Sequence, residues 1–381
     1  MAKHMKLDVL DVRTYQASKS SKFSKLTTAT LSASLLMAIA GYSNSARSIE
    51  PEPIQPAHPL ASVNIASAET IRTVDFDWQD ASRQRAVPVR LYLPKAVSET
   101  ADAAGSIAVS SAGGAVVKAV PLIVFSHGLG GSRNGYQYLG RFWAAHGYAS
   151  MHVQHIGSDN QLWRGNPFSL TMRLKDAAQD IEAVARAKDV SFALTEILAQ
   201  PQFAGRFDAS RIVAAGHSYG ANTTMLLAGA AVPNKGENGQ ILNLRDPRIK
   251  AAMLLSAPPF YGYSNPALIL GGIALPTLHV TATADDIMVP GYGSGVDDRV
   301  GVYNAMGDPR KTLVVFTGGS HSIFTDRAGT GGAELNPRVK AATQALSLAF
   351  LRQTLGSETG ALAQWQPQFA DLVAKFINPV K

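Results

Sequence analysis

Residues 211–231 read RIVAAGHSYGANTTMLLAGAA, with one serine between two glycines where two patterns meet. The apolar run 211–215 is typical of a short buried strand, and the Ala- and Leu-rich run 221–231 of a helix. A strand that passes directly into a helix needs a strained bend, and glycines remove Cβ atoms where the two elements nearly touch. The stretch predicts a nucleophile elbow, G-x-S-x-G, with Ser218 at its tip. His217, inside the motif, is expected to support the elbow rather than to react.

Apolar runs and helical patterns alternate along most of the chain. Strands are predicted as an early hairpin-like pair at 71–78 and 85–94, and then at 120–126, 148–155, 211–215, 249–259, 275–285 and 311–319. Helices are predicted at 135–147, 169–200 (with a kink or as two helices), 221–231 and 336–356. Repeated strand–helix units predict an α/β fold with a mainly parallel central sheet and helices on both faces. Active residues of such a sheet lie beyond the carboxyl ends of its strands.

The first part of the chain differs from the rest. Lys19, Lys22 and Lys25 precede the run LTTATLSASLLMAIAGYSNSA at 26–46. A basic region, an apolar run of about a dozen residues and a small-residue end are typical of a secretory signal peptide. We therefore expect residues 1–46 to be a signal peptide and the protein to be secreted or periplasmic. An uncleaved anchor or a disordered tail is the alternative.

Composition divides the remainder into a leader and one large domain. Residues 47–70 are rich in Pro and Ala, which predicts a flexible leader. Residues 71–381 predict a single catalytic domain, long enough to bury a substantial core. Within this domain, residues 96–119 consist mainly of Ala, Ser, Gly and Val, and we interpret them as a surface insertion between strands.

Charge and cysteine content exclude several classes of protein. The chain carries a formal net charge of +7, of which residues 1–46 contribute +4 from six basic and two acidic residues, so +3 remains for the rest. That balance is not the footprint of a nucleic-acid binder. No run reaches the roughly 18 continuous apolar residues of a membrane span. The absence of cysteine excludes disulfides, thiolate metal sites and a cysteine nucleophile.

Two later strands end in the residue types that a serine nucleophile needs, a base and a buried carboxylate. His321 follows the last strand and a Gly-Gly turn in TLVVFTGGSHSIF, which makes it the candidate base. Asp285 and Asp286 follow the preceding strand in PTLHVTATADDIMVP. We choose Asp285, because Ile287 two residues later can anchor the loop in the core, and interpret Asp286 as a capping or solvent-facing carboxylate. The order Ser218, Asp285, His321 is that of the α/β-hydrolase fold.

Backbone N–H groups for a developing oxyanion are predicted at two places. One is the amide after the nucleophile, that of Tyr219, at the start of a helix. The other is the amide of Leu129 in IVFSHGLGGSRNGY, where three glycines leave the backbone accessible. This loop has neither the spacing nor the lysine of a phosphate-binding P-loop, which disfavours nucleotide binding.

Three other features have competing interpretations. His152 and His155 with Asp159 suggest a metal site, but strand ends usually carry such residues as hydrogen-bonded supports and no third histidine is near, so we predict no metal. Trp163 either lines a substrate pocket or packs against the domain. Residues 291–299 are glycine-rich, follow the acid and predict a mobile loop near the site.

FSHGLGGSRNGYQYLGRFWAAHGYASMHVQHIGSD, GHSYGA, TADD and GGSH together resemble a group of α/β-hydrolases. The group includes platelet-activating-factor acetylhydrolases, predicted dienelactone hydrolases and bacterial cutinase-like polyester hydrolases. The resemblance implies a serine carboxylic-ester hydrolase with the nucleophile, acid, base and two oxyanion donors at Ser218, Asp285, His321, Leu129 and Tyr219. The chain departs from the group in four ways. It lacks the cysteine nucleophile of dienelactone hydrolases, the Met after the nucleophile usual in cutinase-like enzymes, and the C-terminal disulfide that many of them have. It also carries the insertion at 96–119, which is not part of the usual compact core.

These features together predict an exported, monomeric serine esterase that acts on short-chain, lipid or polyester esters through an acyl-enzyme and needs no cofactor. Its expected partner is the ester substrate, with no nucleic acid and no stable membrane span. Two alternatives remain. One is a peptidase or amidase on the same fold, although the sequence has no propeller domain or large lid. The other is a non-catalytic α/β-hydrolase that binds a partner, although such proteins usually lack a triad member.

Overall fold

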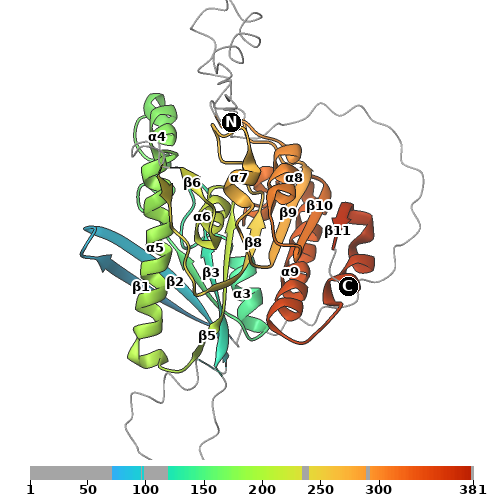
Figure 1. The fold of residues 1–381 in the computed structure, drawn as a ribbon, viewed down its shortest axis with the longest axis horizontal. Coiled ribbons are helices and arrows are strands. Elements are labelled where there is room, and N and C mark those ends of the chain that lie inside the picture. The colour runs from blue at the N-terminus through green and yellow to red at the C-terminus, as the bar shows by residue number, and fades with distance from the viewer. Residues whose placement is uncertain (1–70, 96, 98–118, 234–239, 289–291, 379–381) are drawn as a thin grey trace, which may run out of the picture. The chain divides into compact units, whose positions relative to one another are not determined.

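A nine-stranded sheet runs through the domain, in the order β1-β2-β4-β3-β5-β8-β9-β10-β11 (Figure 1). The computed structural model describes residues 71–95, 97, 119–233, 240–288 and 292–378, so the predicted signal peptide, the leader and nearly all of the predicted insertion lie outside it. The strands of the sheet are β1 (Ile71–Asp80), β2 (Arg85–Pro94), β3 (Val120–Ser126), β4 (Ala149–Val153), β5 (Phe207–His217), β8 (Ile249–Leu255), β9 (Thr277–Ala284), β10 (Lys311–Ser320) and β11 (Val373–Ile377). Two short strands, β6 (Val232–Pro233) and β7 (Ile241–Leu242), pair separately.

Parallel pairing forms the centre of the sheet and antiparallel pairing its two ends. β3 lies parallel to β4 and β5, and the parallel series continues through β8, β9 and β10. The β1–β2 hairpin joins β4 in antiparallel fashion at one end, and β11 joins β10 at the other. The predicted α/β fold with a mainly parallel sheet is therefore confirmed.

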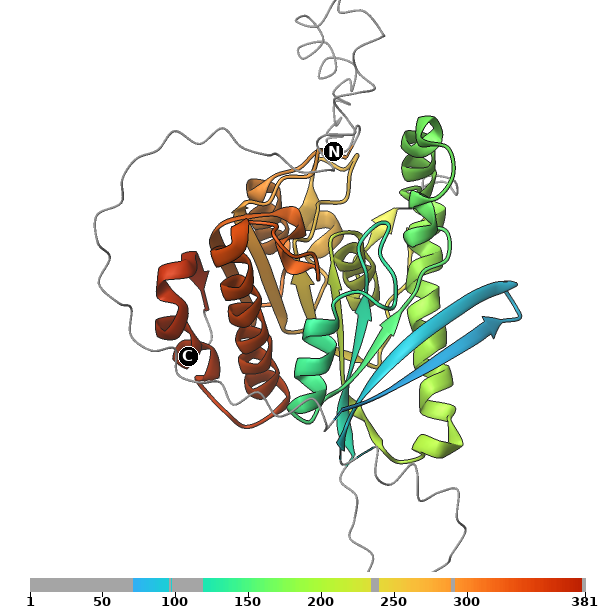
Figure 2. The same ribbon diagram turned by 180° about the vertical axis from the view of Figure 1, so that it is seen from behind.

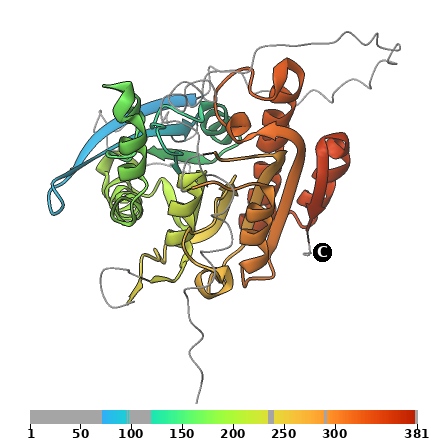
Figure 3. The same cartoon turned by 90° about the horizontal axis from the view of Figure 1, so that it is seen from above.

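Helices cover both faces of this sheet because its central strands are apolar on both sides (Figures 2 and 3). In β3, Leu122 and Val124 enter the core on one face, while Ile123 and Phe125 enter the core on the other. The first face carries α5 (Asp180–Ala199), α6 (Tyr219–Ala228), α7 (Pro266–Leu270) and α8 (Val296–Ala305), and the second carries α3 (Gln137–Ala145), α9 (Gly332–Leu355) and α10 (Ala361–Trp365). A further helix, α4 (Leu170–Ala177), precedes α5. No helix in the described ranges has the length and apolar character needed to cross a membrane.

The carboxyl ends of four parallel strands bring the predicted site residues to one edge of the sheet. β3 ends at Ser126, directly before the glycine-rich loop, and β5 ends at His217, directly before Ser218. β9 ends one residue before Asp285, and β10 ends at the residue before His321. Because these strands are parallel, their ends share an edge, as expected for active residues in such a sheet.

The structure differs from the sequence prediction in several segments, and β6, β7, α7 and α10 were among the elements not predicted. The segment 291–299, predicted as a mobile loop, contains the start of α8 at Val296, where the Asp298 carboxylate accepts the Gly295 N–H at 2.8 Å. The edge strand β11 was not predicted, because five residues with partly exposed side chains give no clear periodicity. Val97, in the predicted surface insertion, is fully buried.

Candidate active site

Ser218 lies in the bend between β5 and α6. Its backbone has φ 56° and ψ −122°, a conformation that residues with a side chain rarely adopt, and its N–H donates to the carbonyl of Leu255 at 2.9 Å. Steric crowding requires glycine at both outer positions of the motif. A Cβ at Gly216 would lie 2.2 Å from the carbonyl oxygen of Gly220, and a Cβ at Gly220 would lie 1.9 Å from the carbonyl oxygen of Ser126. The predicted elbow is therefore present in the backbone.

The side chains of Ser218, His321 and Asp285 form one chain of hydrogen bonds. Ser218 Oγ lies 2.8 Å from His321 Nε2, and His321 Nδ1 lies 2.7 Å from Asp285 Oδ1. A carboxylate only accepts hydrogen bonds, so His321 Nδ1 carries the ring proton and Nε2 accepts from the serine hydroxyl. The structure thus brings together the three side chains that the sequence singled out, although Ser218 and His321 are 103 residues apart.

Asp285 is fully buried, whereas Asp286 is exposed. The second oxygen of Asp285 accepts from the Thr281 hydroxyl at 2.7 Å and lies 3.5 Å from Nε of the buried Arg299. Burial alone raises the pKa of Asp285, but the hydrogen bond and charge of His321 and the charge of Arg299 outweigh it and hold this pKa well below the ordinary 3.8. The carboxylate behind His321 is therefore an anion. The role of Arg299 was not predicted, because α8 was not.

The loop after β3 has one backbone amide that stands apart from its neighbours. Three amides of this loop have acceptors: Gly128 N–H donates to Tyr136 Oη at 3.3 Å, Gly130 N–H to the Ser158 carbonyl at 2.8 Å, and Gly131 N–H to the Gly128 carbonyl at 3.0 Å. Within the described part of the chain, the Leu129 N–H has no hydrogen-bond acceptor. An amide left free between hydrogen-bonded neighbours is available to a ligand.

The amide of Tyr219 is the second predicted donor. It belongs to the first residue of α6, and no hydrogen bond of this amide occurs among the described residues. The N–H groups of a first helical turn have no partner within the helix and lie at its positive end. The glycine-rich loop is adjacent, because a Cβ on Gly128 would lie 3.3 Å from Ser218 Cβ. Both predicted donors therefore flank the serine.

The Trp163 indole lies against the same loop. Its Nε1–H donates to the Gly130 carbonyl at 2.7 Å, and a Cβ on Gly130 would come within 2.4 Å of the indole ring. Trp163 is nevertheless 41% exposed. The side chain thus packs on the loop and also leaves an apolar surface exposed beside it.

A chain of polar contacts that was not predicted links the loop to His321. Tyr136 Oη accepts from Gly128 N–H and donates to His217 Nδ1 at 2.8 Å, and His217 Nε2–H donates to the His321 carbonyl at 2.9 Å. Burial lowers the pKa of His217 to about 3, so the ring is neutral and one of its nitrogens can accept. His217 supports the site, as expected. Tyr136 gave no signal in the sequence, since it lies 81 residues away from His217.

The residues weighed for a metal site have separate hydrogen-bond partners. His152 Nδ1 lies 3.1 Å from the Gly135 carbonyl, and His155 Nδ1 lies 3.1 Å from the Asp189 carboxylate. Asp159 accepts from the Gln154 side chain at 2.7 Å. Across the described residues, no group of three or more His, Asp, Glu or Cys side chains is arranged to hold a metal ion.

Comparison with known proteins agrees with the fold described above. A family model described as platelet-activating factor acetylhydrolase, isoform II, matches residues 86–162. Among solved structures, the chain is similar to a ferulic acid esterase from Streptomyces cinnamoneus, with 25% identity and a TM-score of 0.52 over 76% of this chain and 91% of that chain. No curated protein matches the sequence at comparable significance. The chain is an α/β-hydrolase similar to the platelet-activating-factor acetylhydrolase group, and it is a carboxylic ester hydrolase.

Proposed function

We propose that this protein is a serine esterase that acts through an acyl-enzyme on Ser218. One observation carries the proposal: Ser218 Oγ lies 2.8 Å from His321 Nε2, and the other nitrogen of the same ring lies 2.7 Å from the buried Asp285 carboxylate. A serine hydroxyl becomes a competent nucleophile when an imidazole accepts its proton and a carboxylate stabilises the resulting cation.

The proposed reaction has two halves. Ser218 Oγ attacks the ester carbonyl while its proton passes to His321 Nε2, and the carbonyl oxygen becomes an anion. Collapse of this tetrahedral intermediate breaks the bond to the alcohol, which leaves with the proton from His321. Water then attacks the acyl-enzyme, giving its proton to His321, and the second intermediate releases the acid and returns the proton to Ser218. Asp285 stays ionised throughout and holds the imidazole in its orientation.

The amides of Leu129 and Tyr219 are the proposed donors to the oxyanion. Both flank Ser218, and neither has another acceptor in the described part of the chain. Donors that are already oriented stabilise the intermediate without reorganisation, and the loss of one typically lowers the rate by about 10²- to 10³-fold.

Short-chain, lipid or polyester esters are the proposed substrates. Two observations support this class: the similar proteins are named for an acetylhydrolase and for an esterase of an aromatic acid, and the exposed face of Trp163 adds apolar surface beside the oxyanion loop. A series of nitrophenyl esters of increasing acyl length, extended by a feruloyl ester and a polyester film, would rank these substrates. We further propose that the enzyme is exported and monomeric, which N-terminal sequencing of the exported protein and its mass in solution would test.

Active-site labelling tests the nucleophile. A fluorescent organophosphonate is expected to label the wild-type protein stoichiometrically and to leave Ser218→Ala unlabelled. Ser322→Ala is the matched control, because Ser322 follows His321 but the imidazole bonds to Ser218 and Asp285 and not to the Ser322 hydroxyl. This variant should label like the wild type. Full labelling of Ser218→Ala would reject the assignment.

The alternatives have their own tests. A peptidase or amidase would hydrolyse an anilide at a rate comparable to that of the matched ester, whereas the proposed esterase strongly prefers the ester. A non-catalytic binding protein would turn over none of the short-chain nitrophenyl esters and would resist the organophosphonate.

A further inference from the structure

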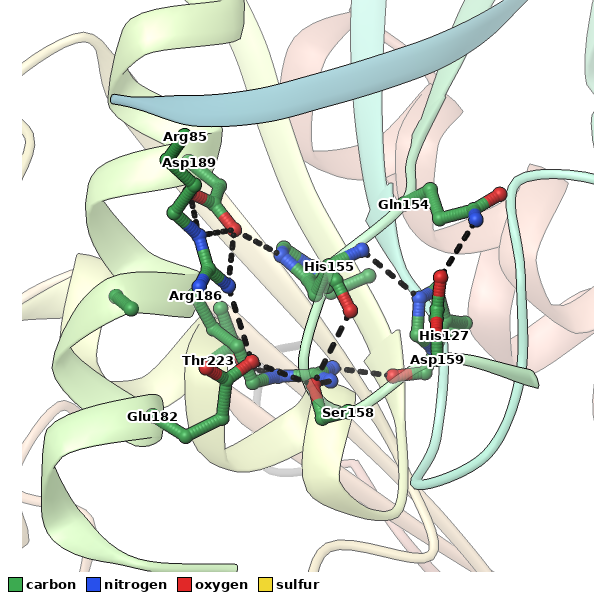
Figure 4. A network of polar contacts seen from close by, with 12 residues as sticks. Arg85, His127, Gln154, His155, Ser158, Asp159, Glu182, Arg186, Asp189 and Thr223 are labelled. Atoms are coloured by element: carbon green, nitrogen blue, oxygen red, sulfur yellow. Dashed lines mark hydrogen bonds and ion pairs between the residues drawn. The ribbon is translucent and has the colours of Figure 1, made fainter. Parts of the chain in front are cut away.

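Arg186 is a fully buried cation that contacts both sides of the predicted oxyanion site (Figure 4). It comes from α5, and its guanidinium donates three hydrogen bonds: to the His127 carbonyl, to Ser158 Oγ at 2.8 Å and to Thr223 Oγ1 at 2.9 Å. The central carbon of the guanidinium lies 4.4 Å from the centre of the Tyr219 ring. One side chain therefore joins the loop after β3 to the first turns of α6.

The contact with His127 holds the loop that carries Leu129. His127 Nε2 accepts the backbone N–H of His155 at 3.1 Å, so Nδ1 carries the proton and donates to the Gly128 carbonyl at 2.7 Å. The C=O and N–H of a trans peptide point in opposite directions. A Gly128 carbonyl held on one side therefore directs the Leu129 N–H to the other side. Arg186 holds the preceding peptide, at the His127 carbonyl, and so fixes the start of this arrangement.

The contacts with α6 hold the second donor. Thr223 Oγ1 accepts from Arg186 and donates to the Tyr219 carbonyl at 3.1 Å, one helical turn earlier. The guanidinium also lies over the Tyr219 ring, a favourable cation–π arrangement that is strengthened by burial. The same charged group thus contacts the residue whose amide is the other proposed oxyanion donor.

Buried carboxylates compensate the charge of Arg186. Ser158, which accepts from Arg186, donates to Glu182 Oε1 at 2.7 Å. Arg85 forms ion pairs with both Glu182 and the buried Asp189 (Figure 4). Burial lowers the pKa of Arg186 to about 10, partly offset by Glu182 and Asp189, so the guanidinium is charged at neutral pH. A buried ion pair is often no more stabilising than an apolar replacement. Stability alone is therefore a weak explanation for this charge.

We propose that Arg186 is a positioning residue for the oxyanion hole. It fixes the distance between the Leu129 and Tyr219 amides, because it binds the backbone of the loop after β3 on one side and α6 on the other. The inference rests on the serine mechanism proposed above. Arg186 does not touch the substrate, so its effect passes entirely through the two amides.

The test compares an ester with its thionoester, in which sulfur replaces the carbonyl oxygen. Sulfur accepts hydrogen bonds poorly, so the ratio of kcat/KM for the two substrates reports on the oxyanion hole rather than on general integrity. Arg186→Met is expected to lower kcat for the oxoester by about 10²-fold with little change in KM, and to lower the oxo/thiono ratio by at least about tenfold. Arg186→Lys keeps the charge but cannot make all three hydrogen bonds. Its oxo/thiono ratio should therefore lie between those of the wild type and Arg186→Met.

Arg85→Met is the matched control. Arg85 pairs with Glu182 and Asp189 in the same network, but it contacts neither the loop nor Tyr219. We expect this variant to lose thermal stability yet keep the wild-type oxo/thiono ratio. A wild-type ratio in Arg186→Met, whatever its kcat, would overturn the proposal. If Arg186→Met does not fold, Arg186→Lys decides: a lowered ratio supports the role, and an unchanged ratio rejects it.

The failure of this inference can be told apart from failure of the proposed function. If organophosphonate labelling persists in Ser218→Ala, the serine mechanism fails regardless of Arg186. If labelling depends on Ser218 but the substrate ratio does not depend on Arg186, only the positioning role fails.

Discussion

The two sides of Ser218 are built differently. On one side, backbone amides after β3 and at the start of α6 are surrounded by buried polar side chains, with Arg186 and His127 at 0% and 1% exposure. On the other side, side chains themselves form the chain of contacts, and the imidazole of His321 is 21% exposed although Asp285 behind it is fully buried. His321 also follows two glycines with positive φ, Gly318 at 71° and Gly319 at 83°.

This difference matches the two tasks in the proposed reaction. A negative charge on the substrate oxygen is best met by dipoles that are already in place and do not reorganise. A proton carrier must instead exchange protons with serine, alcohol and water in turn, which requires an accessible nitrogen. The side of Ser218 that faces the oxyanion is therefore expected to be rigid, and the side that moves the proton is expected to stay accessible.

Asp285→Asn is expected to have the largest effect, and to impair the proton-transfer side of Ser218 while leaving the oxyanion side intact. The variant keeps the size of the side chain but removes the charge that stabilises the imidazolium, and kcat should fall by about 10⁴-fold. The oxo/thiono ratio should stay near the wild-type value, because both amide donors remain. Asp286→Asn, one residue later and exposed, is the control and should retain nearly full activity. A loss of less than tenfold in Asp285→Asn would contradict the role of this carboxylate.

A smaller effect, shared by both sides, is expected from Tyr136→Phe. The Tyr136 hydroxyl is bonded both to Gly128 N–H in the loop and to His217, which holds the His321 carbonyl. Removing it leaves two buried polar groups unpaired, at about 1–3 kcal/mol each, and we expect kcat to fall by about tenfold with a measurable drop in thermal midpoint.

Tyr138→Phe is the control for Tyr136→Phe. The Tyr138 hydroxyl donates to the Phe324 carbonyl at 3.0 Å and contacts neither the loop nor His217. This variant should lose stability but keep kcat. Equal kcat values for the two variants would show that the link through Tyr136 has no catalytic importance.

Acidification is expected to act on the stability of the fold rather than on kcat. Burial lowers the pKa values of His152, His217 and His279 from 6.5 to about 3, and those of His127 and His155 well below 6.5. The unfolded chain therefore binds these protons first as the pH falls below about 6.5, and the free energy of unfolding should drop by up to about 1.4 kcal/mol per pH unit for each histidine. The loss should continue down to about pH 3 for the first three.

Urea unfolding between pH 7.5 and pH 4.5 measures this slope. His279→Gln removes one such histidine on β9, where the His279 ring contacts Thr277 rather than the site. This variant should reduce the slope by the contribution of one bound proton. A free energy of unfolding that stays constant from pH 7 to pH 5 would contradict the neutral, buried state of these rings.

Residues that act through their place on a strand were predictable. Ser218, Asp285 and His321 each follow a recognisable apolar run, and parallel strands bring such positions to one edge. The glycines of the elbow were predictable for the same reason, since their role is local. The helices α7, α8 and α10 and the strand β11 were missed, and with α8 the buried Arg299 that faces Asp285.

The Arg186 network was missed although the sequence contained a hint. Glu182, Arg186 and Asp189 lie at spacings of four and three residues, which places them on one face of α5. Charged residues on one helical face usually contact solvent, and the sequence does not distinguish a buried charged face from an exposed one. The partners of Arg186, namely His127, Ser158 and Thr223, lie 28 to 59 residues away from it.

By itself the sequence determined the parallel centre of the sheet, the serine elbow and the positions of the acid and the base, because strand periodicity and strained turns depend on neighbouring residues. Only the tertiary structure decided which charges are buried, which amides are left without a partner and which side chains join the two sides of Ser218. Those properties depend on contacts between segments far apart in the chain. Burial, which sets the pKa values and the worth of each hydrogen bond, exists only once those segments have packed together.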